Sequence, residues 1–235
     1  MHLILNWENL GENWFEGIIG RFGREHEYSK VMPEYDDCKK YLEIIGNLVY
    51  HVDSTYPDQN LLFFRVREMP KQLSILHFLI VASLYPQSIR ELRYILESVI
   101  QAYYIDMEHP DAGIMCKLEV LKEIEMMVGG RLIEATNLGE KKKIHKLYKD
   151  LSRYTHSSHE KLEPAIEREL TLNIFFGYND RMFKEATALT KRTVDTILFI
   201  ILNFQNHLIP IVNDNEELKD SLSNFKLTNQ LISSL

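Results

Sequence analysis

A chain of 235 residues forms one large domain or two small ones, and it can bury a core without disulfides or metals. Its composition is 45% hydrophobic and 26% charged, with only ten glycines and seven prolines, which excludes intrinsic disorder and favours helices over a turn-rich β protein. A formal net charge of −7 predicts that the protein as a whole is repelled by nucleic acid and by anionic membranes. Cys38 and Cys116 are too few for a disulfide framework or a four-cysteine zinc site, and we expect both to be reduced.

The first nine residues have neither the basic region nor the long apolar region of a signal peptide. The two longest apolar runs, Leu73–Tyr85 and Thr196–Phe204, are shorter than the roughly 20 residues that cross a bilayer. We therefore expect a cytoplasmic protein that does not enter a membrane.

The distribution of periodic segments predicts a single domain in three parts. Residues 1–33 hold both tryptophans and are expected to be irregular or to form one short helix. Helical periodicity begins after Pro33, so residues 34–213 are expected to form a helical bundle. Residues 214–235 are expected to form a C-terminal helix or tail.

Apolar residues at three- and four-residue steps place the individual helices. We expect helices over residues 34–52, 70–84, 86–107, 112–128, 140–156, 179–210 and within 215–235. Pro70 is expected in the first turn of its helix, where its missing N–H costs nothing, and Pro210 at the end of the last long helix. For residues 163–176 the sequence allows either a helix or a short strand.

The helix that begins at Pro86 has the strongest core signal. Its apolar residues recur at alternating steps of three and four, as in a heptad seam, so we expect it at the centre of the bundle. The seam consists of Ile89, Leu92, Leu96, Val99 and Tyr103. The next helix is expected to bury Ile114, Leu118, Leu121, Ile124 and Val128. The fold class predicted is an all-α bundle of about six to eight helices.

The helix over 140–156 is strongly basic. Between Lys141 and Arg153, five lysines and one arginine face Asp150 alone, which gives a local charge of +5 and leaves −12 for the rest of the chain. Such a helix can attract an anionic partner even in an acidic protein. The alternative is a solvated helix face that has no ligand.

Four polar side chains of this helix are candidates for phosphate binding. With Ile144 facing the core, helix geometry places them away from the centre of the apolar face. Lysine and hydroxyl groups donate hydrogen bonds to phosphate oxygens. The candidates are Lys142, Lys146, Lys149 and Ser152, with His145 and His156 on the same flank as Lys149 and Ser152.

Arg93 and Glu97 are four residues apart on the central helix and are expected to form an ion pair. They flank the apolar seam, so the pair is expected to be partly buried. A buried pair of this kind serves packing in most proteins and can also orient a site. Both roles are open, and we include Arg93 and Glu97 as an orienting pair.

A metal site is not expected. His156, His159 and Glu163 have spacings that could place ligands on one ion. Two or three ligand-type residues are weak evidence, and the chain has no His-Glu-x-x-His motif. We predict no metal and no cofactor.

Two short segments resemble a known superfamily. One is Arg-Tyr-Ile-Leu-Glu at 93–97, followed by the apolar run 99–104, and the other is Tyr-Lys-Asp-Leu-Ser-Arg-Tyr-Thr-His at 148–156. The second is similar to a Tyr-x-x-Leu-Ser-x-x-x-His pattern. Together they resemble the HEPN-like superfamily of helical-bundle proteins.

The resemblance implies an activity and a site. Catalytic members of that superfamily cleave RNA without a metal, with an arginine and a histidine four to six residues apart, usually across a homodimer. In this chain Arg153 and His159 have five residues between them. The resemblance implies that Arg153 stabilises the charged phosphorane-like state and that His159 or His156 transfers the proton. The residue after the arginine is usually small and polar, and here it is Tyr154.

The sequence therefore predicts a homodimeric helical protein that binds RNA or a nucleotide, and it leaves open whether the protein cleaves RNA. A non-catalytic interaction or scaffold protein is the alternative, which the net charge of −7 favours.

Overall fold

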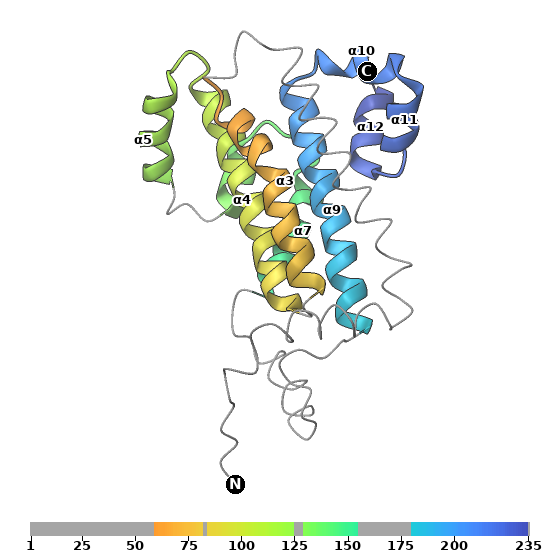
Figure 1. The fold of residues 1–235 in the computed structure, drawn as a ribbon. Helices are drawn as coiled ribbons and strands as arrows, with labels where there is room; N and C mark the ends of the chain where they lie inside the picture. The colour runs from red at the N-terminus through yellow and green to blue at the C-terminus, as the bar shows by residue number, and fades with distance from the viewer. Residues whose placement is uncertain (1–58, 82–83, 125–128, 155–179, 235) are drawn as a thin grey trace.

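The computed structural model describes residues 59–81, 84–124, 129–154 and 180–234. They form an all-α bundle, as predicted (Figure 1). The helices are α3 (Leu61–Val81), α4 (Tyr85–Glu108), α5 (Ile114–Ile124), α6 (Gly129–Ala135), α7 (Lys141–Ser152), α9 (Asp180–Phe204), α10 (Leu208–Asp214), α11 (Glu216–Leu222) and α12 (Lys226–Ser234). The helix expected over 34–52 and the segment 163–176 lie outside the described residues.

Four helices build the body of the bundle. α4 and α9 pack against each other and run in the same direction, whereas α3 and α7 run in the opposite direction (Figure 1). The end of α7 and the starts of α4 and α9 consequently lie at one end of the bundle, the lower end in Figure 1. α5 packs mainly against α4 and stands apart from the other helices, and α12 packs against α9.

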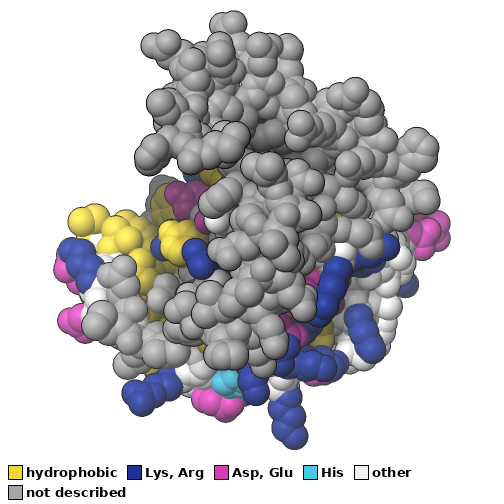
Figure 2. All heavy atoms as spheres, turned by 90° about the horizontal axis from the view of Figure 1, so that it is seen from below, with side chains coloured by type: hydrophobic (Ala, Val, Ile, Leu, Met, Phe, Trp, Pro, Cys, Tyr) yellow, Lys and Arg dark blue, Asp and Glu magenta, His cyan; other side chains and the backbone are white. Residues whose placement is uncertain are grey.

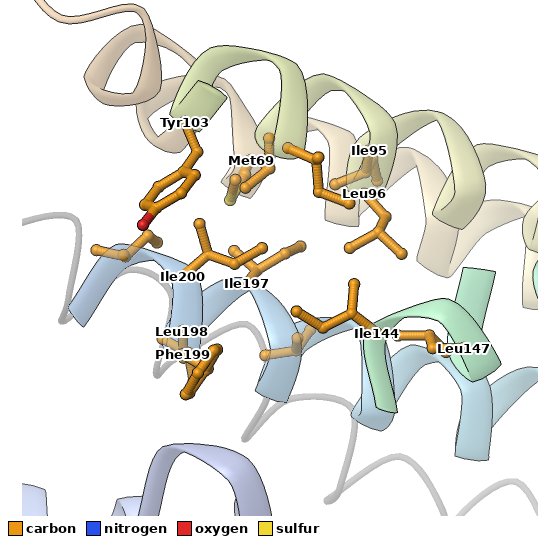
Figure 3. Close-up of a cluster of buried hydrophobic side chains, with 14 of the residues drawn as sticks. Met69, Ile95, Leu96, Tyr103, Ile144, Leu147, Ile197, Leu198, Phe199 and Ile200 are labelled. Carbon is orange, nitrogen blue, oxygen red and sulfur yellow. The ribbon is translucent and has the colours of Figure 1, made fainter. Parts of the chain in front are cut away.

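The core lies where α3, α4, α7 and α9 meet. Figure 3 shows side chains of all four helices converging, among them Met69, Leu96, Ile144 and Ile197. The predicted seam of α4 is confirmed, because each of its five residues is 1% exposed or less. α4 also ends before His109, as the sequence predicted.

α3 is longer than predicted. It begins at Leu61 and continues through Pro70, which the sequence placed in a first turn. A proline inside a helix removes one hydrogen bond and costs about 3 kcal/mol. Buried residues on both sides of it, Val66 and Met69 before and Leu73 after, share one apolar face, and their packing holds a single helix.

The C-terminal part also differs from the prediction. α9 ends at Phe204 rather than Pro210, and Pro210 lies in the first turn of the separate helix α10. Proline is accommodated there because the first N–H groups of a helix have no partner within it. Two short helices, α11 and α12, occupy the region after Asn215.

Two buried aspartates cap helices that are distant in sequence. The Asp106 carboxylate, at the end of α4, accepts hydrogen bonds from the Leu61 and Leu62 N–H groups at 3.0 and 2.8 Å. The Asp195 carboxylate of α9 accepts them from Leu227 and Thr228 at 2.9 and 3.0 Å. Each aspartate thereby satisfies free N–H groups at the start of α3 or α12.

The apolar face predicted for α5 does turn toward the bundle, although it is not fully buried. Ile124 is buried, Ile114, Leu118 and Leu121 are partly buried and pack against the core, and Val128 lies outside the described residues. The sequence did not predict that Lys117, on the same face, is buried as well. Lys117 Nζ lies 3.0 Å from Asp106 Oδ1, and both side chains are fully buried. The Asp106 carboxylate therefore supplies the partner that allows a lysine to be buried on the apolar face of α5.

No single described helix is long and apolar enough to cross a membrane, although α9 and α10, bent by 117° between them, together pass that test by length and composition alone.

Candidate functional site

A row of exposed basic side chains runs along α7. Lys142, Lys146, Lys149 and Arg153 lie within about 60° of one another around the helix axis, opposite buried Ile144. We name these four residues the α7 basic stripe. In the part of the chain that the structure describes, none of the three lysines forms an ion pair or a hydrogen bond. All three side chains are exposed.

The other two lysines of α7 have partners in neighbouring helices. Lys141 Nζ donates to the Glu134 carbonyl at 2.7 Å. Lys143 Nζ donates to Gln230 of α12 at 2.9 Å and lies 3.1 Å from the Glu140 carboxylate. These contacts hold α7 against α6 on one side and α12 on the other.

The flank that carries His145 and Ser152 is engaged within the protein. His145 Nε2 lies 2.7 Å from Glu134 Oε1, and Ser152 Oγ donates to the Tyr148 carbonyl at 2.7 Å. The sequence grouped both residues with the phosphate-binding lysines. In the structure both lie on a flank beside the stripe, His145 against the exposed Glu134 carboxylate and Ser152 against a carbonyl of its own helix.

Arg93 and Glu97 form an ion pair at 3.2 Å, and Tyr148 of α7 joins them. The Tyr148 hydroxyl accepts a hydrogen bond from Arg93 Nη2 at 2.8 Å and donates one to Glu97 Oε1 at 2.7 Å. The guanidinium also lies 5.1 Å from the centre of the Tyr148 ring. Burial, followed by the Glu97 carboxylate, raises the pKa of Tyr148, so its hydroxyl keeps its proton.

A second tyrosine fixes the end of α7. Arg90 Nε of α4 donates to the Tyr154 carbonyl at 3.0 Å. The Tyr154 hydroxyl is hydrogen-bonded to the Glu185 carboxylate of α9, and burial together with this carboxylate raises the pKa of Tyr154 strongly. α4 and α9 therefore hold the residue that directly follows Arg153.

Asp150, the one acid between residues 141 and 153, lies between two arginines. Its carboxylate is 2.9 Å from Arg192 Nη1 of α9 and 3.9 Å from Arg153 Nη1. The Arg153 side chain remains 63% exposed. Asp150 therefore links the α7 basic stripe to a cation of α9 and is itself neutralised.

The cations of α9 were not among the residues predicted from the sequence. Residues 181–192 contain Arg181, Lys184, Lys191 and Arg192 against Glu185, a local charge of +3. A charge count along this helix would have found them, but only the folded chain shows that they lie beside α7. Figure 2, viewed onto the end where α9 begins, shows Lys and Arg side chains along the side of the molecule where Figure 1 places α7 and α9.

The two histidines predicted to be catalytic, His156 and His159, lie outside the described residues. The segment that contains them starts where Tyr154 is held by α4 and α9. In the described ranges, no group of three or more His, Cys, Asp or Glu residues is arranged to hold a metal ion.

When the chain is compared with known proteins, it matches no family model, no curated protein and no solved structure.

Proposed function

We propose that this protein binds RNA or a nucleotide through the α7 basic stripe. The observation that carries the proposal is the exposed row formed by Lys142, Lys146, Lys149 and Arg153, whose three lysines have no acidic partner in the described structure. An acidic chain that concentrates unpaired positive charge on one helix face attracts phosphates there and repels them elsewhere. The Arg93–Glu97–Tyr148 cluster supports the stripe by holding α7 on α4.

The resemblance to the HEPN-like superfamily adds RNA cleavage to the proposal. Arg153 would stabilise the negative charge of the phosphorane-like state. His159 or His156 would transfer the proton. The same resemblance implies that two copies of the chain combine to complete the site.

A salt series tests the binding. Fluorescence anisotropy with single-stranded RNA is measured between about 50 and 200 mM salt. The triple variant Lys142→Gln, Lys146→Gln and Lys149→Gln should flatten the log–log salt dependence by about 2.1, because each lost phosphate contact removes about 0.7. When the salt is lowered fourfold, the affinity of the triple variant should therefore rise about 18-fold less than that of the wild type.

A matched control carries the same change of charge elsewhere. Lys71, Lys122 and Lys219 are exposed on α3, α5 and α11, so replacing these three by glutamine should leave the slope as in the wild type. His159→Ala should also leave the slope nearly unchanged at neutral pH, where imidazole is mostly uncharged, but should abolish cleavage. Binding without cleavage by the wild type would remove the catalytic roles of Arg153 and His159 and leave a recognition module.

A scaffold that binds another protein is the second candidate function. Exposed apolar side chains on α3 and α5 favour it: Phe64 is 38% exposed, Ile75 45% and Met115 69%. The salt series separates the two candidates. If the wild type binds neither RNA nor a nucleotide at about 50 mM salt, the nucleic-acid proposal is wrong and the scaffold function takes its place.

A further inference from the structure

We propose that the ligand of the α7 basic stripe is a single-stranded nucleic acid several nucleotides long, which continues from α7 onto Arg192 and Arg181 of α9. This inference rests on the proposed function and decides between its two ligands, a polynucleotide strand and a mononucleotide.

Two cross-links fix how α7 and α9 lie against each other. Asp150 of α7 contacts Arg192, and Tyr154, two residues after the end of α7, is hydrogen-bonded to Glu185, so the residue that is later in the chain meets the earlier residue of α9. The two helices are therefore antiparallel, with Arg192 level with the last turn of α7. Arg181, one turn before Glu185, lies beyond the end of α7.

The basic side chains of both helices then form one continuous path. Twelve residues separate Lys142 from Tyr154, or about 18 Å along the helix, and Arg181 lies about 6 Å farther. Phosphates of one B-DNA strand advance about 3.4 Å each along the axis, so the path of about 24 Å corresponds to about seven phosphates. The phosphates of one nucleotide reach only part of this length.

The net charge of the path is strongly positive. Residues 141–154 and 181–192 together carry +8 in a protein whose total charge is −7. The two acids beside the path are engaged: Asp150 is paired with arginines and Glu185 with the Tyr154 hydroxyl. A polyanion is therefore drawn to this side of the molecule and repelled by the rest.

The embedding of α7 favours a single strand over a duplex. Reading a duplex groove requires a helix that protrudes from the protein. α7 is held on both flanks, by Lys141 and His145 against Glu134 and by Lys143 against Gln230. A shallow basic surface of this kind follows one backbone, as single-strand-binding grooves do.

A membrane surface fits the path poorly. Helices that lie in a membrane interface bury an apolar face among the lipids. The apolar face of α7 is already in the protein core, and every large exposed apolar side chain among the described residues lies on α3, α4 or α5. The path therefore offers charge without apolar insertion, which suits a nucleic-acid backbone.

The test compares a long and a short ligand. A fluorescently labelled strand of about 12 nucleotides, within the 4–16 that one single-strand-binding module covers, is measured beside a labelled trinucleotide. Both are 2′-O-methyl RNA, which lacks the free 2′-hydroxyl and stays intact. Six contacts, four on α7 and two on α9, predict a slope of about −4.2 for the long strand, an affinity gain of about 340-fold from 200 to 50 mM salt.

The variant Arg181→Gln/Arg192→Gln isolates α9. Between about 200 and 50 mM salt, the affinity of this variant for the long strand should rise only about 50-fold, because two phosphate contacts are lost. For the trinucleotide the variant and the wild type should have the same slope. Lys71→Gln/Lys122→Gln is the charge-matched control, and circular dichroism verifies that each variant is folded.

The outcomes separate the inference from the proposed function. If neither ligand binds at about 50 mM salt, the proposed function itself fails. If the trinucleotide binds but the long strand shows no steeper salt dependence, or the α9 variant leaves its slope unchanged, only the inference fails. If anionic phosphatidylserine vesicles or polyglutamate compete as well as the unlabelled long strand, the ligand of the path is a lipid surface or an acidic protein, and the inference is wrong.

Discussion

Tyr148 shows how a residue acquires a role that its own helix does not reveal. The Arg93–Glu97 ion pair could be predicted because its members are one helical turn apart. The Tyr148 hydroxyl, which bonds both, is 51 residues from Glu97 in sequence. Helix geometry places Tyr148 near Ile144 on the inward side of α7, but the spacing of apolar residues carries no information about the polar group that the ring meets.

Removing this hydroxyl should cost measurable stability. Tyr148→Phe loses one hydrogen bond to Arg93 and one to Glu97, and we expect the free energy of unfolding to fall by about 1–3 kcal/mol in urea. Tyr94→Phe, at a side chain of α4 that is 51% exposed, is the control and should change it by less than about 0.5 kcal/mol. Equal effects of the two changes would contradict the cluster.

Tyr154 should make stability sensitive to alkaline pH. Burial and the Glu185 carboxylate raise its pKa in the folded state, so above about pH 10 the unfolded chain loses this proton while the folded chain keeps it. The stabilisation is thus complete below the unfolded pKa and is lost as the pH rises toward the folded one. In Tyr154→Phe, unfolding measured from pH 8 to 11 should show a shallower alkaline decline than the wild type, and identical slopes would exclude this linkage.

At the scale of elements, the sequence predicted helices best where a single apolar face determines which residues are buried. The seam of α4 and the inward position of Ile144 on α7 follow from periodicity alone. Pro70 of α3 and Lys117 of α5 did not follow the local rules. Packing before and after Pro70 overrides the proline, and a carboxylate at the end of α4 allows a lysine to be buried on the apolar face of α5. Both causes lie outside the segment that the rules describe.

The Lys117–Asp106 pair should be the main attachment of α5. Lys117→Met leaves a buried carboxylate without its cation and also removes the 2.7 Å hydrogen bond to the Gln59 carbonyl. Breaking such a pair costs about 3–5 kcal/mol, which thermal or urea unfolding measures. The same change at exposed Lys122, which pairs with the exposed Glu119, should cost less than about 0.5 kcal/mol. A loss below 1 kcal/mol in Lys117→Met would show that the pair does not hold α5.

For the whole molecule, composition and periodicity were enough to predict the all-α class, because few glycines and three–four spacing are properties of the chain itself. The α7 basic stripe was also within reach, since its lysines lie on one helix. Its extension over α9 was not, because Asp150 and Arg192 are 42 residues apart and only folding brings them together. The catalytic roles of His156 and His159 remain predictions.

The capping of α12 by α9 should be visible in hydrogen exchange. Asp195→Ala removes the acceptor of the Leu227 and Thr228 N–H groups, a loss of about 0.5–2 kcal/mol for a helix cap. Amides of α12 should then exchange about 2- to 30-fold faster, with α4 unchanged if α12 opens locally. Asp214→Ala, at an exposed position at the end of α10, serves as the control. Equal acceleration in α4 and α12 would mean that α12 opens only with the whole bundle.

The two capping aspartates also make synthesis on the ribosome asymmetric. α12 meets a cap that the chain already contains, since Asp195 precedes Leu227 by 32 residues. α3 has no such advantage, because Asp106 follows Leu61 by 45 residues. At about 5–20 residues per second, the start of α3 waits about 2–9 s for its acceptor to be made. During that interval the apolar face of α3 has neither its cap nor its partner α4, so the growing chain is most exposed to misassociation while α4 is being synthesised.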